Sequence, residues 1–143
     1  MTICFLDKSK VKQITALYRD NFSDGWSEDM LISGFESGRF YAIGAFEGQT
    51  LIGVITFSTA CDEADIEGVT VDNAFRKRGI GYALYECAQK FLIEKGIKSI
   101  FLEVRATNFS AQNLYIKAGF NKISVRKNYY ADGEDALVMK KEL

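Results

Sequence analysis

Residues 69–96 read VTVDNAFRKRGIGYALYECAQKFLIEKG, and this stretch decides the fold. An apolar run ends at Val71, a basic glycine-containing segment follows, and apolar residues then recur at helical spacing up to Leu92. Gly96 supplies a helix stop. The stretch therefore predicts a strand, a loop and a long amphipathic helix that packs on a sheet. The predicted apolar face consists of Ile80, Ala83, Leu84, Cys87, Ala88, Phe91 and Leu92.

The segments before this stretch predict two helices followed by three strands. Lys10 to Phe22 carries apolar residues at helical spacing, and Ser27 opens a second short helix after the loop at residues 23–26. Apolar runs then predict strands from Phe40 to Phe46 and from Leu51 to Thr59, with a third run up to Val71. Short turns join these strands, so they form an antiparallel meander.

The segments after the long helix predict a buried strand from Ile97 to Arg105, a short helix from Ser110 to Ala118, and two closing strands. A polar loop at residues 130–134 lies between the closing strands. Strands therefore stand before and after a central helix. The chain is predicted to be one mixed α/β domain that spans residues 1–143.

Composition excludes several classes of protein. The chain has 143 residues, of which 48% are hydrophobic, and its 18 basic and 19 acidic side chains give a net charge of -1. This size fits one domain, and the charge balance does not favour a direct nucleic-acid partner. No apolar run is long enough to cross a membrane, and the N-terminal residues do not resemble a signal peptide. No membrane partner is expected.

The cysteine and histidine counts narrow the chemistry. Cys4, Cys61 and Cys87 are odd in number and form no C-x-x-C pair, which favours a reducing compartment and hence the cytoplasm. All three are expected to be small hydrophobic residues, with Cys87 on the apolar helix face. The chain has no histidine, which excludes Ser-His-Asp and Cys-His catalysis and removes the commonest zinc ligand. No metal is expected.

The loop from Arg76 to Gly81 combines three cations with two glycines at a helix N-terminus. Glycines permit close backbone approach, and the first helical N–H groups favour an anion, so the loop suits a pyrophosphate. A basic solvated turn is the alternative interpretation. The loop is neither a Walker motif nor a dinucleotide fingerprint, because Leu84 stands where the third glycine of G-x-G-x-x-G belongs.

The R-x-x-G-x-G sequence of this loop resembles the coenzyme A pyrophosphate loop of the GNAT family of N-acetyltransferases. The resemblance implies a strongly twisted mixed sheet of about six or seven strands with about four helices on its two faces. It also implies that acetyl-coenzyme A is the cosubstrate. The residues that this resemblance assigns to the pyrophosphate end are Arg76, Lys77, Arg78, Gly79, Ile80, Gly81 and Tyr82.

Two further side chains are candidates for chemistry. Glu103 interrupts the apolar run of a buried strand, where an unpaired charge is costly. It either serves the reaction or pairs with Arg105, which lies two residues on and on the same face. Tyr115 lies on the apolar face of the short helix after this strand, where it is either functional or an ordinary core residue.

Four separated blocks resemble one GNAT subgroup, the RimI-type ribosomal-protein alanine N-acetyltransferases. The blocks are Trp26 to Glu28, Leu102 to Asn108, Asn113 to Tyr115 with Ala118 to Phe120, and Arg126 to Tyr130 with Gly133 to Ala136. The resemblance implies that Glu103 is the general base and Tyr115 the general acid. It also implies that Asn108 binds the pantetheine arm and that a strand edge receives the thioester carbonyl. The edge residues are Val69, Thr70 and Val71, and the peptide-binding residues are Trp26, Tyr129, Tyr130 and Asp135.

These residues predict direct transfer in a ternary complex, because no cysteine has a histidine to activate it. The expected substrate is the N-terminal α-amine of a protein, namely the alanine terminus of a small-subunit ribosomal protein, as the resemblance implies. A free small amine, such as an amino sugar or polyamine, is one alternative substrate. A non-catalytic module that binds acyl-coenzyme A is another alternative.

Overall fold

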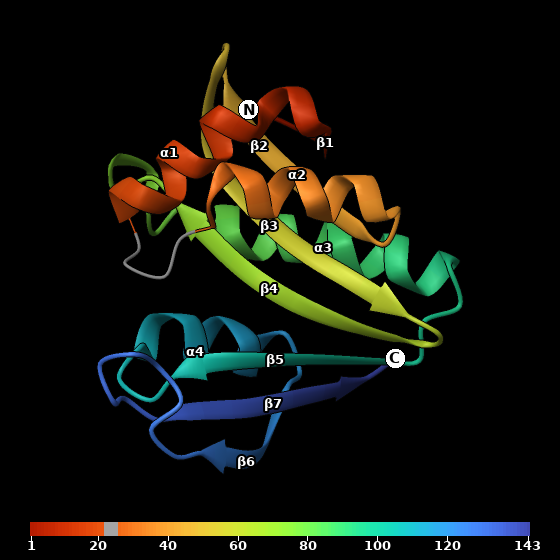
Figure 1. Ribbon diagram of the computed structural model, residues 1–143, viewed down its shortest axis with the longest axis vertical. Coiled ribbons are helices and arrows are strands. Elements are labelled where there is room, and N and C mark those ends of the chain that lie inside the picture. Colours follow the sequence, from red (N-terminus) through yellow and green to blue (C-terminus); the bar gives the residue numbers. More distant parts are fainter. Residues whose placement is uncertain (22–25) are drawn as a thin grey trace.

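The computed structural model describes residues 1–21 and 26–143 (Figure 1). One seven-stranded sheet has the strand order β1-β2-β3-β4-β5-β7-β6. The strands are β1 (Thr2–Leu6), β2 (Phe40–Glu47), β3 (Thr50–Ala60), β4 (Glu63–Val71), β5 (Ser99–Arg105), β6 (Asn121–Arg126) and β7 (Ala136–Glu142). The helices of the described residues are α1 (Val11–Asn21), α2 (Glu28–Ser37), α3 (Ile80–Glu94) and α4 (Phe109–Lys117), with short 3-10 turns η1 (Lys8–Lys10) and η2 (Asn73–Phe75).

The helices cover both faces of the sheet, as the resemblance implied. Neighbouring residues of β3 show this division: Ile55 belongs to the core beneath α3, whereas Val54 belongs to the core beneath α1 and α2. Successive strand residues point to opposite faces, so one strand supplies both cores. Leu84 of α3 and Ile14 of α1 are fully buried in these two cores.

The sheet opens in its middle, between β4 and β5. These two strands are the parallel pair of the sheet, and their pairing covers only Glu63–Ile66 of β4 and Ser99–Leu102 of β5. Both strands continue beyond this point, and Figure 1 shows them diverging. A β-bulge lies next to the divergence, because Thr56 pairs with Gly68 and Phe57 with Ile66, which leaves Glu67 as the extra residue of β4. Bulges bend a strand and end its regular pairing.

Most of the predicted elements are confirmed, including the meander of β2, β3 and β4 and the long helix α3. Strand β1 was not predicted from the sequence. It is an edge strand in which only Leu6 is buried, so it lacks the alternation that marks a half-buried strand. Phe22 and the predicted loop residues 23–25 lie outside the described residues. No helix in the described ranges is both long and apolar enough to span a membrane.

The predicted position of Cys87 on the apolar face of the long helix is wrong. Cys4, Cys61 and Cys87 are all exposed. Helix α3 is rotated so that Tyr85 takes the buried position next to Leu84, which turns Cys87 outward. Cys61 lies in the turn between β3 and β4 with φ 55°.

Candidate active site

The loop between β4 and α3 presents backbone N–H groups at a helix N-terminus. Lys77 and Gly79 both have left-handed backbone conformations, with φ 64° and 77°. The first hydrogen bond of α3 runs from Ala83 N to Gly79 O over 3.0 Å, so the preceding N–H groups of the helix have no intrahelical acceptor. The helix dipole adds a partial positive charge at this end. The loop therefore has the geometry of an anion site.

A cavity of about 630 Å³ lies beside this loop, between β4, α3 and α4. We call it the loop cavity. Its lining includes every residue that the sequence analysis assigned to coenzyme A except Arg78, whose guanidinium lies 5.1 Å from the ring centroid of Phe75. A Cβ built at Gly81 would contact Leu114 at 3.6 Å and Val69 at 3.7 Å, so a larger side chain there would extend into the loop cavity.

The edge of β4 that faces this cavity carries unpaired backbone groups. Asp72 N donates to Ile52 O of β3 over 2.8 Å, so the N–H group of Asp72 points toward β3. Because successive backbone N–H groups of a strand point to opposite sides, the N–H group of Thr70 also points toward β3. The N–H groups of Val69 and Val71 then point to the open side, where β5 has diverged. The carbonyl oxygen of Val71 accepts a hydrogen bond of 3.1 Å from Arg76 Nε and not from β3, which confirms that the backbone groups of Val71 point away from β3. Two N–H groups are available there to an acceptor oxygen.

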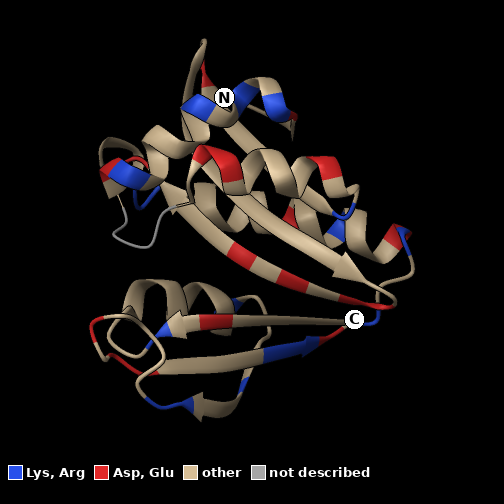
Figure 2. Ribbon diagram, in the orientation of Figure 1, with Lys and Arg blue, Asp and Glu red and all other residues tan. Residues whose placement is uncertain are grey.

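A second cavity of about 680 Å³ lies on the other side of the opening, between β4, β5 and the loop that joins β6 to β7. We call it the acidic cavity, because Glu63, Asp65, Glu67 and Glu103 line it. Figure 2 shows acidic positions along β4 and on β5. Burial raises the pKa of Asp65, and the charges of Glu103 and Glu63 raise it further. Arg105 and Arg126 also line the cavity, but the four carboxylates outnumber these two cations, so the cavity favours a positively charged group.

Asp65 and Glu67 were not predicted as site residues from the sequence. Burial also raises the pKa of Glu67, against the lowering effect of a hydrogen bond of 2.7 Å from Ser58 Oγ, and the charges of Asp65 and Glu103 add to the rise. A signal was present, because acidic and small or apolar residues alternate from Glu63 to Gly68. That alternation places the carboxylates on one face of β4.

Glu103 lies in the acidic cavity with its two carboxylate oxygens in different surroundings. Oε1 lies 3.4 Å from Arg126 Nε, whereas Oε2 is buried and has no hydrogen-bond partner among the described residues. The nearby Glu103 carboxylate is the main reason that the pKa of Tyr129 is raised. Arg105, the expected structural partner of Glu103, has its Nη1 atom 2.8 Å from Glu134 and 2.9 Å from Asp132.

Tyr115 lies where the two cavities meet, and its side chain lines both. The residue is buried, and its ring packs edge to face on Phe120 with a centroid distance of 5.6 Å. Burial raises the pKa of its hydroxyl, and Tyr18, Tyr85 and Tyr130 contribute further. No hydrogen bond among the described residues occupies this hydroxyl. It is therefore a protonated donor without a described acceptor.

Asn108 also lies at the junction of the two cavities. Its Oδ1 accepts a hydrogen bond of 3.1 Å from Ala111 N and so caps the N-terminus of α4. Its Nδ2 group remains available to donate to a ligand. Val69 and Ala111 complete the set of residues that line both cavities.

The predicted peptide-binding residues do not all come together. Tyr129 and Tyr130 line the acidic cavity. Trp26 packs against Phe40 with a ring centroid distance of 5.2 Å, and it is not among the residues that line either cavity. Asp135 accepts hydrogen bonds from Asn128 N at 2.9 Å and from Lys127 Nζ at 3.2 Å, so it holds the loop rather than lining the cavity.

Several other residues of the loop cavity were not predicted. Phe75 follows β4, while Ser110, Leu114 and Lys117 come from α4. Nothing in the sequence pattern of α4 distinguishes these positions, because they line a cavity only after α4 has packed beside α3. No group of three or more His, Cys, Asp or Glu side chains in residues 1–21 and 26–143 is arranged to hold a metal ion.

Comparison with known proteins gives the family of this chain. Residues 11–120 match the Acetyltransferase (GNAT) family, so the chain belongs to the GNAT family and is an N-acetyltransferase. The ribosomal protein bS18-alanine N-acetyltransferase of Haemophilus ducreyi is 35% identical over 118 residues, which cover 80% of this chain and 81% of that protein.

The enzyme of the same name from Escherichia coli K12 is 33% identical over 117 residues, which cover 80% of this chain and 78% of that protein. The crystal structure of the ribosomal-protein-S18-alanine N-acetyltransferase from Escherichia coli superimposes with a TM-score of 0.90 at 29% identity. The match covers 99% of this chain and 92% of that chain. The RimI-type resemblance of the sequence is thereby confirmed.

Proposed function

We propose that this chain transfers the acetyl group of acetyl-coenzyme A to the N-terminal α-amine of a protein, namely the N-terminal alanine of a small-subunit ribosomal protein. The names of the relatives support the ribosomal substrate. The observation that carries the proposal is the meeting of the two cavities at Val69, Asn108, Ala111 and Tyr115. One cavity suits a phosphate-bearing thioester, and the other suits a cationic amine.

The loop cavity fits coenzyme A by the chemistry of its residues. The free N–H groups at the start of α3 and the nearby Lys77 suit the pyrophosphate. The apolar side chains of Leu114 and Val69 suit the extended pantetheine arm, and the Nδ2 group of Asn108 can donate to one of its carbonyl groups. The N–H groups of Val69 and Val71 would hold the thioester carbonyl and stabilise its developing negative charge.

The acidic cavity fits the amine. An α-amine is mostly protonated at pH 7, and its ammonium form is attracted to the carboxylates of Asp65, Glu67 and Glu103. Glu103 would remove the proton directly or through water. The α-amine has a pKa of about 8, so its deprotonation at pH 7 costs about 1.4 kcal/mol, whereas a lysine side chain costs about 4.6 kcal/mol. An ordinary carboxylate suffices for the α-amine.

Tyr115 would protonate or hydrogen-bond the leaving sulfur. Because burial holds its pKa above the usual value of 10.0, the hydroxyl keeps its proton at neutral pH. A thiol has a pKa of about 8.5, so full proton transfer from the phenol to the thiolate is uphill, and the main contribution of Tyr115 is a hydrogen bond. The amine side and the thioester side meet at this residue, which supports direct transfer in a ternary complex.

The test uses the purified chain with acetyl-coenzyme A and a peptide that begins with alanine and continues with basic residues. A matched peptide with a blocked α-amine is the control. We expect acetylation of the α-amine in the first peptide alone, with intersecting double-reciprocal lines. Faster turnover of a polyamine or an amino sugar would overturn the proposed substrate. Coenzyme A binding without turnover of any amine would overturn the enzymatic role of the site.

A further inference from the structure

The loop at residues 127–135, which joins β6 to β7, is here called the closing loop. It contributes Tyr129 and Tyr130 to the wall of the acidic cavity. A loop of this length holds a defined wall only if other parts of the protein fix it. One attachment is Arg105, the last residue of β5, which lies two residues after Glu103 on the same strand.

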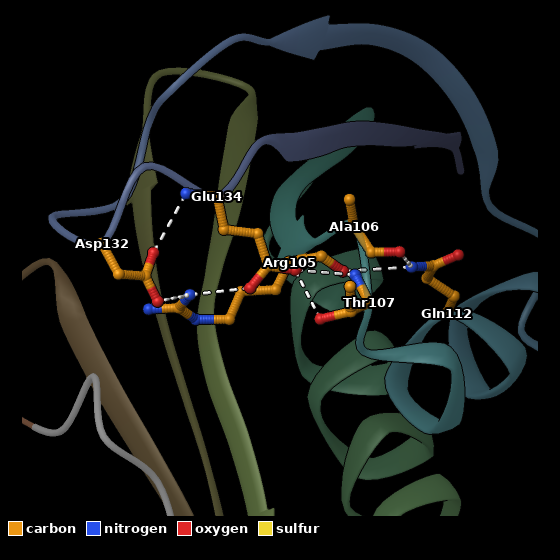
Figure 3. Close-up of polar contacts among 6 residues, drawn as sticks. All are labelled: Arg105, Ala106, Thr107, Gln112, Asp132 and Glu134. Carbon is orange, nitrogen blue, oxygen red and sulfur yellow. Dashed lines mark hydrogen bonds and ion pairs between the residues drawn. The ribbon is translucent and has the colours of Figure 1, made fainter.

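Arg105 binds two acidic residues of the closing loop (Figure 3). Its Nη1 atom lies 2.8 Å from Oε1 of Glu134 and 2.9 Å from Oδ2 of Asp132. The side chains of Arg105 and Glu134 are only 18% and 20% exposed, whereas that of Asp132 is 62% exposed. Exposed ion pairs contribute little, and removal of one partner of a shielded pair costs more. The pair with Glu134 is therefore the stronger attachment.

Glu134 extends the attachment to the turn that precedes α4. Its Oε2 atom accepts a hydrogen bond of 2.8 Å from Thr107 N and another from the Thr107 hydroxyl. Glu134 also accepts a backbone hydrogen bond of 3.1 Å from Tyr130 N. The hydrogen bond from the Thr107 hydroxyl is the largest cause of the lowered pKa of Glu134, and the hydrogen bonds from Arg105 and Thr107 N and the charge of Arg105 lower it further. Glu134 thus ties the loop to the segment that leads to Asn108.

Arg105 also contacts the cavity wall directly. Its guanidinium lies 4.1 Å from the ring centroid of Tyr130, and the rings of Tyr130 and Tyr129 pack edge to face at 5.1 Å. A guanidinium over an aromatic face is attractive, and more so where water is excluded. Tyr129 in turn interacts with Glu103. The guanidinium of Arg105 therefore links β5, which carries Glu103, to Tyr130 directly and to Tyr129 through the ring of Tyr130.

We propose that Arg105 is a positioning residue that, through Glu134 and the ring of Tyr130, holds the closing loop as the peptide-facing wall of the acidic cavity. This inference rests on the proposed function, because the wall matters only for a substrate that enters this cavity. Release of the loop would weaken peptide binding. It would leave coenzyme A binding intact, because none of the closing-loop residues lines the loop cavity.

The experiment compares Glu134→Gln and Arg105→Lys with the parent chain. The glutamine keeps an acceptor for Thr107 but removes the charge, and the lysine keeps the charge but loses the planar group over Tyr130. We expect each variant to raise the KM for an alanine-initiated peptide by about ten-fold, with kcat changed by less than about three-fold and the coenzyme A Kd by less than about two-fold. Glu36→Gln, which weakens an exposed pair with Lys8, is the matched control and should change none of these values.

Hydrogen exchange of the substrate-free protein gives a second readout. Thr107 N donates to the Glu134 side chain, whereas Tyr130 N donates to the Glu134 backbone carbonyl. Release of the closing loop would open both bonds more often, so we expect both amides to exchange faster in Glu134→Gln. Equal losses in peptide and coenzyme A affinity would overturn the positioning role, because they indicate a general loss of structure. Unchanged peptide KM in both folded variants would also overturn it. If the parent acetylates no peptide, the proposed function fails, and the exchange data still decide whether Arg105 and Glu134 fix the loop.

Discussion

Glu103 and Arg126 form an unequal pair, because Arg126 Nε lies 3.4 Å from one carboxylate oxygen while the other oxygen is buried without a described partner. The side chain of Arg126 is 57% exposed, so water screens its charge, whereas that of Glu103 is 29% exposed. A shielded carboxylate oxygen without a partner is costly unless a ligand satisfies it. The α-amine of the proposed substrate would supply that hydrogen bond.

Replacement of Glu103 by Gln should therefore lower turnover of an alanine-initiated peptide by about 100-fold at pH 7, as loss of a general base commonly does. The affinity for coenzyme A should stay nearly the same. A higher pH should restore part of the rate, because more of the amine is then already neutral. The measurement is a profile of turnover from pH 6 to 9.5.

Glu63→Gln is the matched control for this change, because Glu63 lines the same cavity at the end where β4 and β5 are still paired. It should alter turnover by less than about three-fold. A Glu103→Gln variant that matches the parent at pH 7 would restrict Glu103 to a structural role with Arg126.

Replacement of Tyr115 by Phe should lower kcat by about ten-fold or more and leave thermal stability nearly unchanged. The ring keeps its packing on Phe120, and no hydrogen bond among the described residues is lost. Because the pKa of Tyr115 is raised, its hydroxyl keeps its proton below pH 10. Ionisation of Tyr115 should therefore cause no decline of the rate in that range. Turnover and thermal melts of both proteins check this. A large loss of stability would indicate that the hydroxyl is a structural group.

Replacement of Gly79 by Ala should weaken coenzyme A binding, because the left-handed backbone that presents the N–H groups is strained for alanine by about 1 kcal/mol. Gly38→Ala is a close control. Gly38 has φ 74° against 77° for Gly79, and a Cβ at either position would meet nothing within 4 Å. The two variants should lose similar stability in denaturation, but calorimetry should show weaker coenzyme A binding for Gly79→Ala alone.

The elements that the sequence predicts correctly are those with strong local patterns. Helix α3 follows from the spacing of Ile80 to Leu92, and the meander follows from apolar runs joined by short turns. The loop from Arg76 to Gly81 was recognisable because its glycines and charges are contiguous. In each case one segment holds all of the information.

The features that the sequence did not predict depend on distant contacts. Arg105 lies near Glu103 in the sequence, which suggested that the two residues pair. In the structure it pairs with Asp132 and Glu134, which lie 27 and 29 residues away. The divergence of β4 from β5 coincides with the bulge at Glu67, which is visible only in the register with β3. Trp26 belongs to a sequence block of the family, but the core around Phe40 determines where its ring packs.

Replacement of all three cysteines by Ser should leave the reaction intact. Cys4, Cys61 and Cys87 are exposed, and none of them is among the residues that line either cavity. Exposed positions tolerate a small polar side chain at little cost in stability. Kinetics of the triple variant check this, and mass spectrometry of the parent with acetyl-coenzyme A alone should reveal no acetylated chain. A trapped acetyl-cysteine would contradict direct transfer.

Replacement of Glu67 by Gln should stabilise the protein and weaken peptide binding at the same time. Burial first, and then the charges of Asp65 and Glu103, raise the pKa of Glu67 above its usual value of 4.5. The folded protein therefore holds this proton more tightly than the unfolded chain does. The contribution of Glu67 to stability is complete below pH 4.5 and is lost as the pH rises through the raised pKa.

Charged Glu67 therefore destabilises the fold at pH 7, and Gln removes this penalty while its amide oxygen still accepts the hydrogen bond from Ser58. Urea denaturation should give a higher midpoint for the variant at pH 7 and equal midpoints near pH 4. The peptide KM should rise by about five-fold, and less at high salt, because one carboxylate that attracts the cationic amine is gone. A variant that is less stable than the parent at pH 7 would show that the negative charge of Glu67 is satisfied within the fold, and an unchanged KM would exclude Glu67 from substrate attraction.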